Sequence, residues 1–237
     1  IIIEPAYDCY EPAITLAGGT TIRVSVDLNT LQIPWDELKS KVNAKTKLIL
    51  VNTPHNPLST VFTQDDWQNL SNIVQQSNAI VISDEVYEHM VFDGNQHISV
   101  LNIEGLKDRS IKVSSFGKTY HCTGWKMGYC IAPASMMKEF RKIHQYNCFS
   151  CHSPVEYAIA EYLQQEEPYL QLGKELQKKR DYFQQLMRQT KFKALPSYGS
   201  YFQLYSYDQI TQESEMDFAT RLTKDAGVVS IPAAAFY

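Results

Sequence analysis

Short apolar runs alternate with amphipathic segments along the first two thirds of the chain. Six runs of apolar and β-branched residues predict strands that are covered on both faces of a sheet. They occupy residues 1–3, 21–26, 47–51, 79–83, 111–115 and 129–132. A helix is predicted at residues 35–42, where Pro34 suits a first helical position. Another is predicted after Thr63, a capping residue followed by acidic side chains and apolar residues at helical spacing.

The last third of the chain is richer in helical patterns. Helices are predicted at residues 136–146, 155–165 and 166–190, the last of them long and polar with a narrow apolar stripe. Short strands at 192–195, 200–207 and 228–231 and a helix at 216–225 predict a smaller α+β unit. The alternation before them favours an α/β fold with a mostly parallel sheet and helices on both faces.

Polar side chains follow three of the predicted strands. One strand ends in Asn-Thr-Pro-His-Asn-Pro (52–57), the next in Asp-Glu-Val-Tyr (84–87), and the third leads into the segment 114–128, which holds two lysines. Open α/β sheets bind ligands beyond the carboxyl ends of their strands. Asn, Asp, Tyr, Ser and Lys gathered there suit a site for an aromatic, phosphorylated aldehyde.

Lys118 stands out because it follows a buried strand within a few residues of a hydroxyl and of Lys126. Gly117-Lys118-Thr119 mimics the end of a P-loop, but Lys112 stands where that motif requires its first glycine, so a P-loop is excluded. A lone lysine of this kind is usually an ordinary surface residue. A desolvated lysine amine, in contrast, suits covalent catalysis on carbonyl compounds.

This ordered set of motifs resembles the class I/II aminotransferases, pyridoxal-phosphate enzymes of fold type I. The likeness is closest to the methionine and kynurenine/glutamine transaminase branch. The resemblance implies a large cofactor-binding domain over residues 1–168. It also implies a linker helix and part of a small C-terminal domain over 169–237. Both ends look cut by comparison, which predicts a chain truncated at both ends.

The resemblance also implies roles for individual residues. Lys118 forms the Schiff base with pyridoxal phosphate, Asp84 pairs with the pyridine nitrogen, and Tyr87 hydrogen-bonds the phenolic oxygen. The remaining expected contacts are Asn56 with that oxygen and the substrate carboxylate, Tyr7 stacked on the ring, and Ser115 and Lys126 at the phosphate. Simpler alternatives stay open: an Asn-Pro turn for Asn56, a helix cap or salt bridge for Asp84, and an ordinary strand-end aromatic for Tyr7.

The activity implied by the resemblance is ping-pong transfer of an amino group from an amino acid to a 2-oxo acid. Methionine, glutamine, kynurenine or aromatic donors are expected, and methionine first, in a homodimer. Two alternatives remain. A carbon–sulfur β-lyase would use the same cofactor site, and a transcription regulator could carry an aminotransferase-like sensor domain.

The composition indicates which partners and which cellular compartment to expect. The net charge of −4 offers no basic surface for nucleic acid or for anionic membranes. No apolar run approaches the roughly 20 residues that span a bilayer. Five scattered cysteines do not resemble a disulfide framework, which favours a reducing cytoplasm.

The segment Cys148-Phe149-Ser150-Cys151-His152 fits the short pattern of c-type haem attachment. Haem attachment would require export, and the apolar start of this chain lacks the basic region and cleavage site of a signal peptide. Zinc binding by Cys148, Cys151 and His152 is the better alternative, but no fourth ligand is evident at metal-site spacing. No metal is therefore assigned from the sequence.

Overall fold

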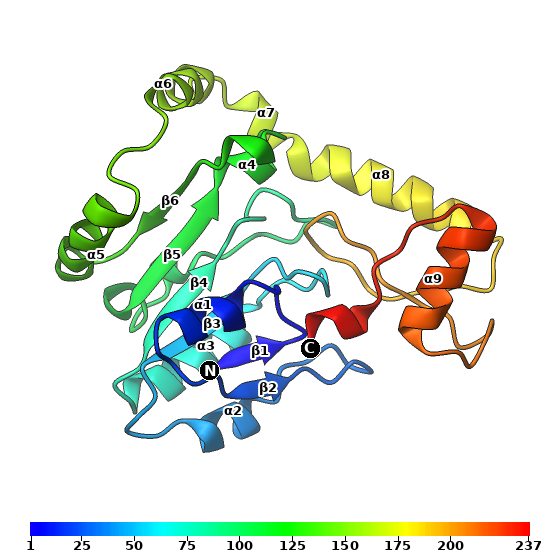
Figure 1. Ribbon diagram of the computed structural model, residues 1–237, viewed down its shortest axis with the longest axis horizontal. Helices are drawn as coiled ribbons and strands as arrows, with labels where there is room; N and C mark the ends of the chain where they lie inside the picture. Colours follow the sequence, from blue (N-terminus) through cyan, green and yellow to red (C-terminus); the bar gives the residue numbers. More distant parts are fainter.

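The computed structural model describes every residue from Ile1 to Tyr237. Its centre is a six-stranded sheet with the order β2-β1-β3-β4-β5-β6 (Figure 1). All neighbouring pairs are parallel except β5 and β6, which are antiparallel. The strands are β1 (Ile2–Glu4), β2 (Arg23–Ser25), β3 (Leu48–Asn52), β4 (Ile80–Asp84), β5 (Ser110–Ser115) and β6 (Gly128–Ile131). The predicted mostly parallel α/β sheet is confirmed.

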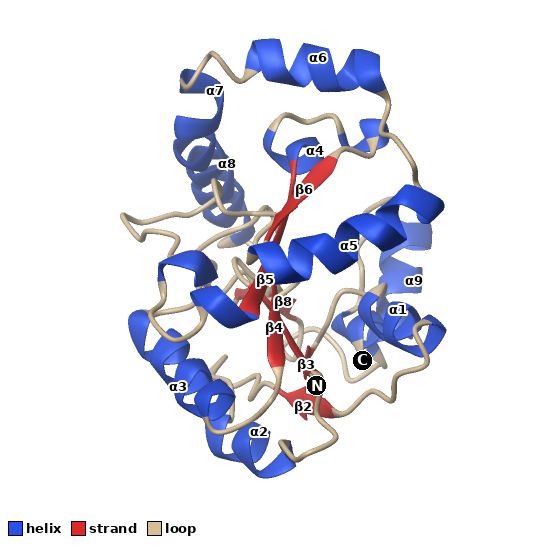
Figure 2. Ribbon diagram, turned by 90° about the vertical axis from the view of Figure 1, so that its left-hand side faces the viewer, coloured by secondary structure: helices blue, strands red, loops and turns tan.

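Helices lie on both sides of this sheet. Seen edge-on in Figure 2, α2 (Trp35–Lys41) and α3 (Gln64–Gln75) lie on one side and α1 (Tyr10–Leu16) on the other. Trp67, Leu70 and Val74 of α3 are fully buried in the main core together with strand residues such as Ile49 and Val81. This burial of large apolar side chains is the main stabilising contribution to the sheet region.

The predicted start of α3 is confirmed in detail. The Thr63 hydroxyl accepts a hydrogen bond from the Asp66 backbone N–H at 3.2 Å, and the Asp66 carboxylate accepts one from the Thr63 N–H at 2.8 Å. This reciprocal capping box satisfies two donors that the first turn would otherwise leave unpaired. Pro34 differs slightly from its expected place, since it is the N-cap residue of α2 and not its first helical residue.

The rest of the chain forms helices and a small second sheet. The helices are α4 (Phe116–Thr119), α5 (Ala134–Asn147), α6 (Ser153–Tyr162), α7 (Glu167–Leu170), α8 (Leu172–Met187) and α9 (Glu215–Ala226). Strands β7 (Lys193–Ala194) and β8 (Tyr205–Ser206) pair antiparallel. The segment after α8 returns to the large sheet region, where the Phe92 N–H donates to the Tyr198 carbonyl and the Ser200 N–H to the Met90 carbonyl, both at 2.8 Å.

Several sequence-based predictions are wrong in this second half. The helix predicted at 166–190 is two helices, α7 and α8. Near the break, Gly173 packs so closely on a loop that an added Cβ would lie 2.8 Å from the Val91 carbonyl oxygen. This close contact between α8 and the loop cannot be predicted from the sequence pattern, and it constrains the position of α8. The strand predicted at 200–207 is reduced to the two residues of β8.

Residues 228–231 also form no strand. Val229 and Ile231 are 79% and 65% exposed, and no strand of the structure pairs with them. A β-branched run becomes a strand only where a partner backbone supplies hydrogen bonds. Helix α1 was not predicted from the sequence, and none of its residues is buried in the structure.

The two ends of the chain lie close together. The Ala6 N–H donates to the Phe236 carbonyl at 2.8 Å, next to the short 3₁₀ turn Ala233–Phe236. No helix is both long and apolar enough to cross a lipid bilayer. The proposed division between residues 1–168 and 169–237 would pass through α7.

Candidate functional site

Two adjacent strands bring Asn52 and Asp84 side by side at their carboxyl ends. These residues are register partners in the β3–β4 pair. The Asn52 side-chain amide donates to the Asp84 carbonyl at 2.9 Å, and its oxygen accepts from the Asn56 backbone N–H at 2.7 Å. Asn52 therefore fixes the loop that carries Asn56 to the end of the neighbouring strand. It was not among the predicted site residues.

Asn56 is buried, with only 8% of its surface exposed. Its side-chain oxygen Oδ1 is also buried and has no hydrogen-bond partner. Buried polar atoms are nearly always paired in folded proteins, because an unpaired one loses its hydration without compensation. An orphaned amide at the carboxyl edge of the sheet thus indicates a place where a ligand completes the hydrogen bonding.

Asp84 ends β4 with its carboxylate mostly buried. One oxygen accepts from the Tyr10 hydroxyl at 2.6 Å and the other from the Val86 N–H at 3.1 Å. Burial raises the pKa of Asp84, while these two hydrogen bonds act in the opposite direction. Burial and the nearby carboxylate raise the pKa of Tyr10 well above its ordinary value, so this hydroxyl remains a donor. The carboxylate has no cation within salt-bridge distance, which suits a cationic ligand atom.

Glu85 and Glu88, which flank the Tyr87 turn at the end of β4, are both held by hydrogen bonds. Glu85 is fully buried and accepts from His97 Nε2 and the Val100 N–H, both at 2.8 Å. Burial alone would raise the pKa of Glu85, but these bonds outweigh it and hold that pKa below its ordinary value. Glu88 accepts from Lys112 Nζ at 2.6 Å. The network fixes the backbone between Asp84 and Glu88 and therefore the direction of the Tyr87 ring.

Lys118 lies on the short helix α4, whose N-cap is Ser115. The Ser115 hydroxyl accepts from the Gly117 N–H at 3.1 Å and donates to the Met127 carbonyl at 3.3 Å. Lys118 Nζ donates to the Tyr201 hydroxyl at 2.9 Å and lies 6.0 Å from the centre of the Tyr87 ring. Tyr87 is 2% exposed, and burial followed by the neighbouring Tyr201 hydroxyl raises its pKa.

A cavity of about 250 Å³ brings four predicted site residues together. Tyr7, Ser115, Lys118 and Lys126 all line it, along with Thr123, Met127 and Gly128. Asp84 does not line the cavity, but Tyr10 connects it to the cavity: the Tyr10 hydroxyl donates to Asp84, and the Tyr10 ring packs edge-on against the Tyr7 ring at 5.6 Å. Asn56 does not line the cavity, and Asn52 connects it to Asp84 by hydrogen bonds to both residues.

These groups fit a phosphorylated pyridine aldehyde. Two ammonium groups and a hydroxyl on one cavity suit a phosphate and a carbonyl carbon, and Tyr7 offers a ring face. The buried carboxylate of Asp84 suits a protonated ring nitrogen, and the orphaned Asn56 amide suits a ring oxygen. Tyr10 and Tyr201 belong to the same arrangement, although no sequence motif singled them out.

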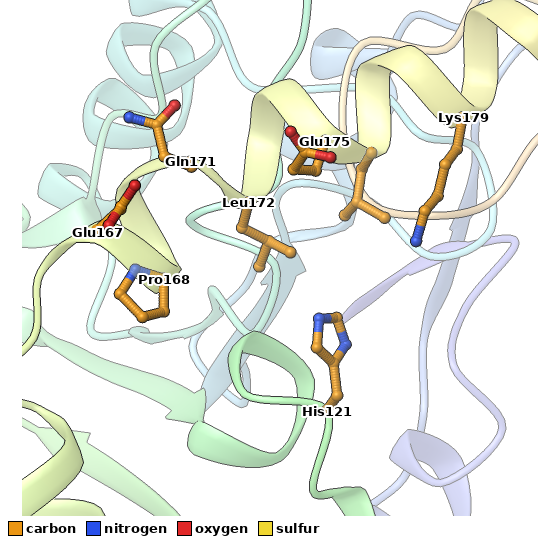
Figure 3. Close-up of a pocket in the computed structure, with 8 residues that line it drawn as sticks. His121, Glu167, Pro168, Gln171, Leu172, Glu175 and Lys179 are labelled. Carbon is orange, nitrogen blue, oxygen red and sulfur yellow. The ribbon is translucent and has the colours of Figure 1, made fainter.

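A larger cavity of about 370 Å³ has a separate lining. Figure 3 shows it between the α7–α8 segment and His121, which follows α4. Its lining is mainly polar and includes Glu167, Glu175 and Lys179. None of the predicted site residues reaches it, so size alone does not identify the reactive centre.

The comparisons with known proteins all point to one enzyme family. The family model described as aminotransferase class I and II matches residues 1–237. Methionine aminotransferase from Escherichia coli (strain K12) is 41% identical over 237 residues, which cover all of this chain and 61% of that protein. Human kynurenine–oxoglutarate transaminase 1 is 32% identical over 267 residues, covering all of this chain and 63% of that protein.

Solved structures agree with this result. The crystal structure of the Escherichia coli protein described as having a methionine aminotransferase function matches with a TM-score of 0.97 and 40% identity. N-succinyldiaminopimelate aminotransferase from Mycobacterium tuberculosis matches with a TM-score of 0.95 and 31% identity. Both alignments cover all of this chain and 62% of the solved one, so the chain spans about three fifths of the length of such relatives.

Proposed function

This chain belongs to the class I and II aminotransferase family, and from this premise we propose that the whole protein moves an amino group from an amino acid to a 2-oxo acid. Members of this family use pyridoxal phosphate. The donors proposed are methionine first, then glutamine, kynurenine or aromatic amino acids. The names of two relatives, a methionine aminotransferase and a kynurenine transaminase, support this choice.

When bound, pyridoxal phosphate supplies a carbonyl carbon that bonds to amines and a protonated ring that takes up electrons. Lys118 Nζ would hold that carbon, while Lys126 and the Ser115 hydroxyl would bind the phosphate from the same cavity. Tyr7 would cover the ring face. The observation that carries the proposal is the convergence of these four residues on one cavity, one of them from the start of the chain and three from the segment 114–128.

The groups beside the cavity would tune the ring and the proton transfers. Asp84 would keep the ring nitrogen protonated, and its burial makes that pairing stronger than it would be in water. Tyr87 and Asn56 would hydrogen-bond the ring oxygen, and Asn56 would also orient the substrate carboxylate. With the donor in place, the Lys118 amine would take the proton from the substrate Cα as a general base and, as a general acid, would deliver it to the former aldehyde carbon of the cofactor.

Ping-pong kinetics follow from this scheme, because the donor's keto acid leaves before the acceptor enters. We test the proposal with a panel of amino-acid donors on the full-length protein, detecting the keto acid that each one forms. Methionine is expected to give the fastest turnover, Lys118→Ala to abolish it, and the exposed Lys45→Ala to leave it unchanged. Pyruvate, ammonia and a free thiol formed from cysteine conjugates, without the 2-oxo acid that keeps the donor's own side chain, would instead indicate a β-lyase.

We further propose a cytoplasmic homodimer. All five cysteines are unpaired in the structure, which is what a reducing compartment allows. Three aromatic residues on α5, on α6 and in the turn between them are largely exposed: Tyr146 by 87%, Phe149 by 80% and Tyr157 by 79%. Aromatic side chains of this kind are enriched at protein interfaces. Light scattering on the full-length protein is expected to give twice the mass of one chain, and a monomer would refute the dimer.

A further inference from the structure

A cluster of metal-ligating side chains lies at the end of α5, outside the cavity that holds Lys118. The ligand atoms of His144, Cys148 and Cys151 all lie within 4.8 Å of one another. Cys148 is exposed and the other two are partly buried, so solvent reaches the cluster. None of the three lines the 250 Å³ cavity.

Local backbone geometry brings these residues together. His144 precedes Cys148 by four residues, and the Cys148 and Phe149 N–H groups both donate to the His144 carbonyl at 2.9 Å. Residues four apart on a helix share a face. Phe149 then adopts a left-handed conformation with φ of 64°, which turns the chain and brings Cys151 back toward Cys148.

The histidine that is adjacent in sequence takes a different position. His152 is the N-cap residue of α6, and its carbonyl accepts from the Val155 N–H at 2.9 Å and the Glu156 N–H at 3.1 Å. It does not belong to the cluster of mutually close ligand atoms. The set Cys148, Cys151 and His152 that the sequence suggested is therefore replaced by one in which His144 is the histidine.

We propose that His144, Cys148 and Cys151 bind a zinc ion, with water at the fourth tetrahedral position. One imidazole and two thiolates are a donor set that zinc prefers. Bond lengths of about 2.0–2.3 Å place tetrahedral ligand atoms roughly 3.3–3.8 Å apart, so small side-chain rotations close the site from its present spread. This site does not depend on the proposed transamination.

The closeness of the two cysteines favours a cation between them. Two thiolates within 4.8 Å of each other would repel, and a bound divalent cation would remove that repulsion. The second group of close ligand atoms in the molecule, Glu85, Glu88 and His97, differs in this respect, since the Lys112 ammonium already lies 2.6 Å from Glu88 and 3.5 Å from Glu85.

Metal titration of the full-length protein tests the proposal. The protein is freed of metal, kept reduced with a phosphine, and titrated with Zn²⁺ in a calorimeter and with Co²⁺ as a spectroscopic probe. We expect one ion per chain and thiolate-to-cobalt charge-transfer absorption. His144→Asn, Cys148→Ser and Cys151→Ser should each weaken zinc binding by more than about tenfold, a loss that even a second-shell change can cause.

Two matched variants serve as controls. His152→Asn removes the adjacent histidine and Cys130→Ser removes a cysteine outside the cluster, and both should bind zinc as the unchanged protein does. Circular dichroism verifies that each variant is folded. The proposal is overturned if the reduced protein binds no zinc, if the three cluster variants bind it as tightly as the controls, or if binding requires His152 and not His144.

Discussion

Acid should destabilise the protein through His55, which lies in the loop that carries Asn56. His55 is 6% exposed, and its Nδ1 accepts from the Leu58 N–H at 3.3 Å, which only a neutral ring can do. Burial lowers the pKa of His55 from 6.5 to about 4. The unfolded chain therefore binds a proton at a higher pH than the folded protein does.

The magnitude follows from this difference. The stability that the neutral ring contributes is fully present above about pH 6.5 and is lost as the pH falls toward the folded value of about 4. Integrating the proton uptake between these limits gives a loss of about 3 kcal/mol at pH 4. His55→Asn keeps an acceptor for the Leu58 N–H but cannot titrate, so the free energy of unfolding of this variant should lack this component.

Urea unfolding followed by tryptophan fluorescence measures the effect at a series of pH values between about 7.5 and 4. The free energy of unfolding of His55→Asn is subtracted from that of the unchanged protein at each pH. The difference no longer contains the contribution of the carboxylates, which both proteins share. The same substitution at the exposed His152 should leave the pH dependence as it was. Equal pH dependence in the unchanged protein and in His55→Asn would refute the reasoning.

Three further substitutions probe the site and its support. Asp84→Ala should retain part of its cofactor, measured by absorbance, while turnover falls by at least about 100-fold, because charge on the ring is no longer stabilised; near-normal turnover would make the aspartate structural. Lys126→Ala should weaken binding of pyridoxal phosphate by about tenfold or more and leave binding of pyridoxal, which lacks the phosphate, almost unchanged. An equal loss of affinity for both ligands would show that Lys126 does not bind the phosphate. Lys112→Met removes the cation beside the buried Glu85 and the partly buried Glu88 and should lower the free energy of unfolding by about 3 kcal/mol. Lys45→Met, on the surface, should change it by less than about 0.5 kcal/mol, and similar losses in both would contradict this account of the network.

Features that depend on neighbouring residues in the sequence were predicted well. The Thr63 cap and the strands before Glu85 and Phe116 each follow from residue types a few positions apart, and the structure confirms these elements. The parallel sheet follows from their alternation. The functional roles of the site residues remain predictions that the experiments above test.

Features that depend on contacts between distant parts of the chain could not be predicted from the sequence. Tyr201 reaches Lys118 across 83 residues, and Tyr10 reaches Asp84 across 74, so no local spacing identifies either tyrosine. The strand predicted at 228–231 failed for the same reason, since pairing depends on a partner elsewhere. At the cysteine cluster, adjacency in sequence suggested His152, whereas the helix turn selects His144.

The central claim is that Lys118 is the residue that binds the carbonyl carbon of pyridoxal phosphate. Full-length protein incubated with pyridoxal phosphate and reduced with borohydride should carry one stable adduct per chain. Peptide mapping by mass spectrometry then locates it without any measurement of activity. The account predicts the adduct on Lys118 and its loss in Lys118→Ala. An adduct on Lys112 or Lys126 in the unchanged protein would contradict it.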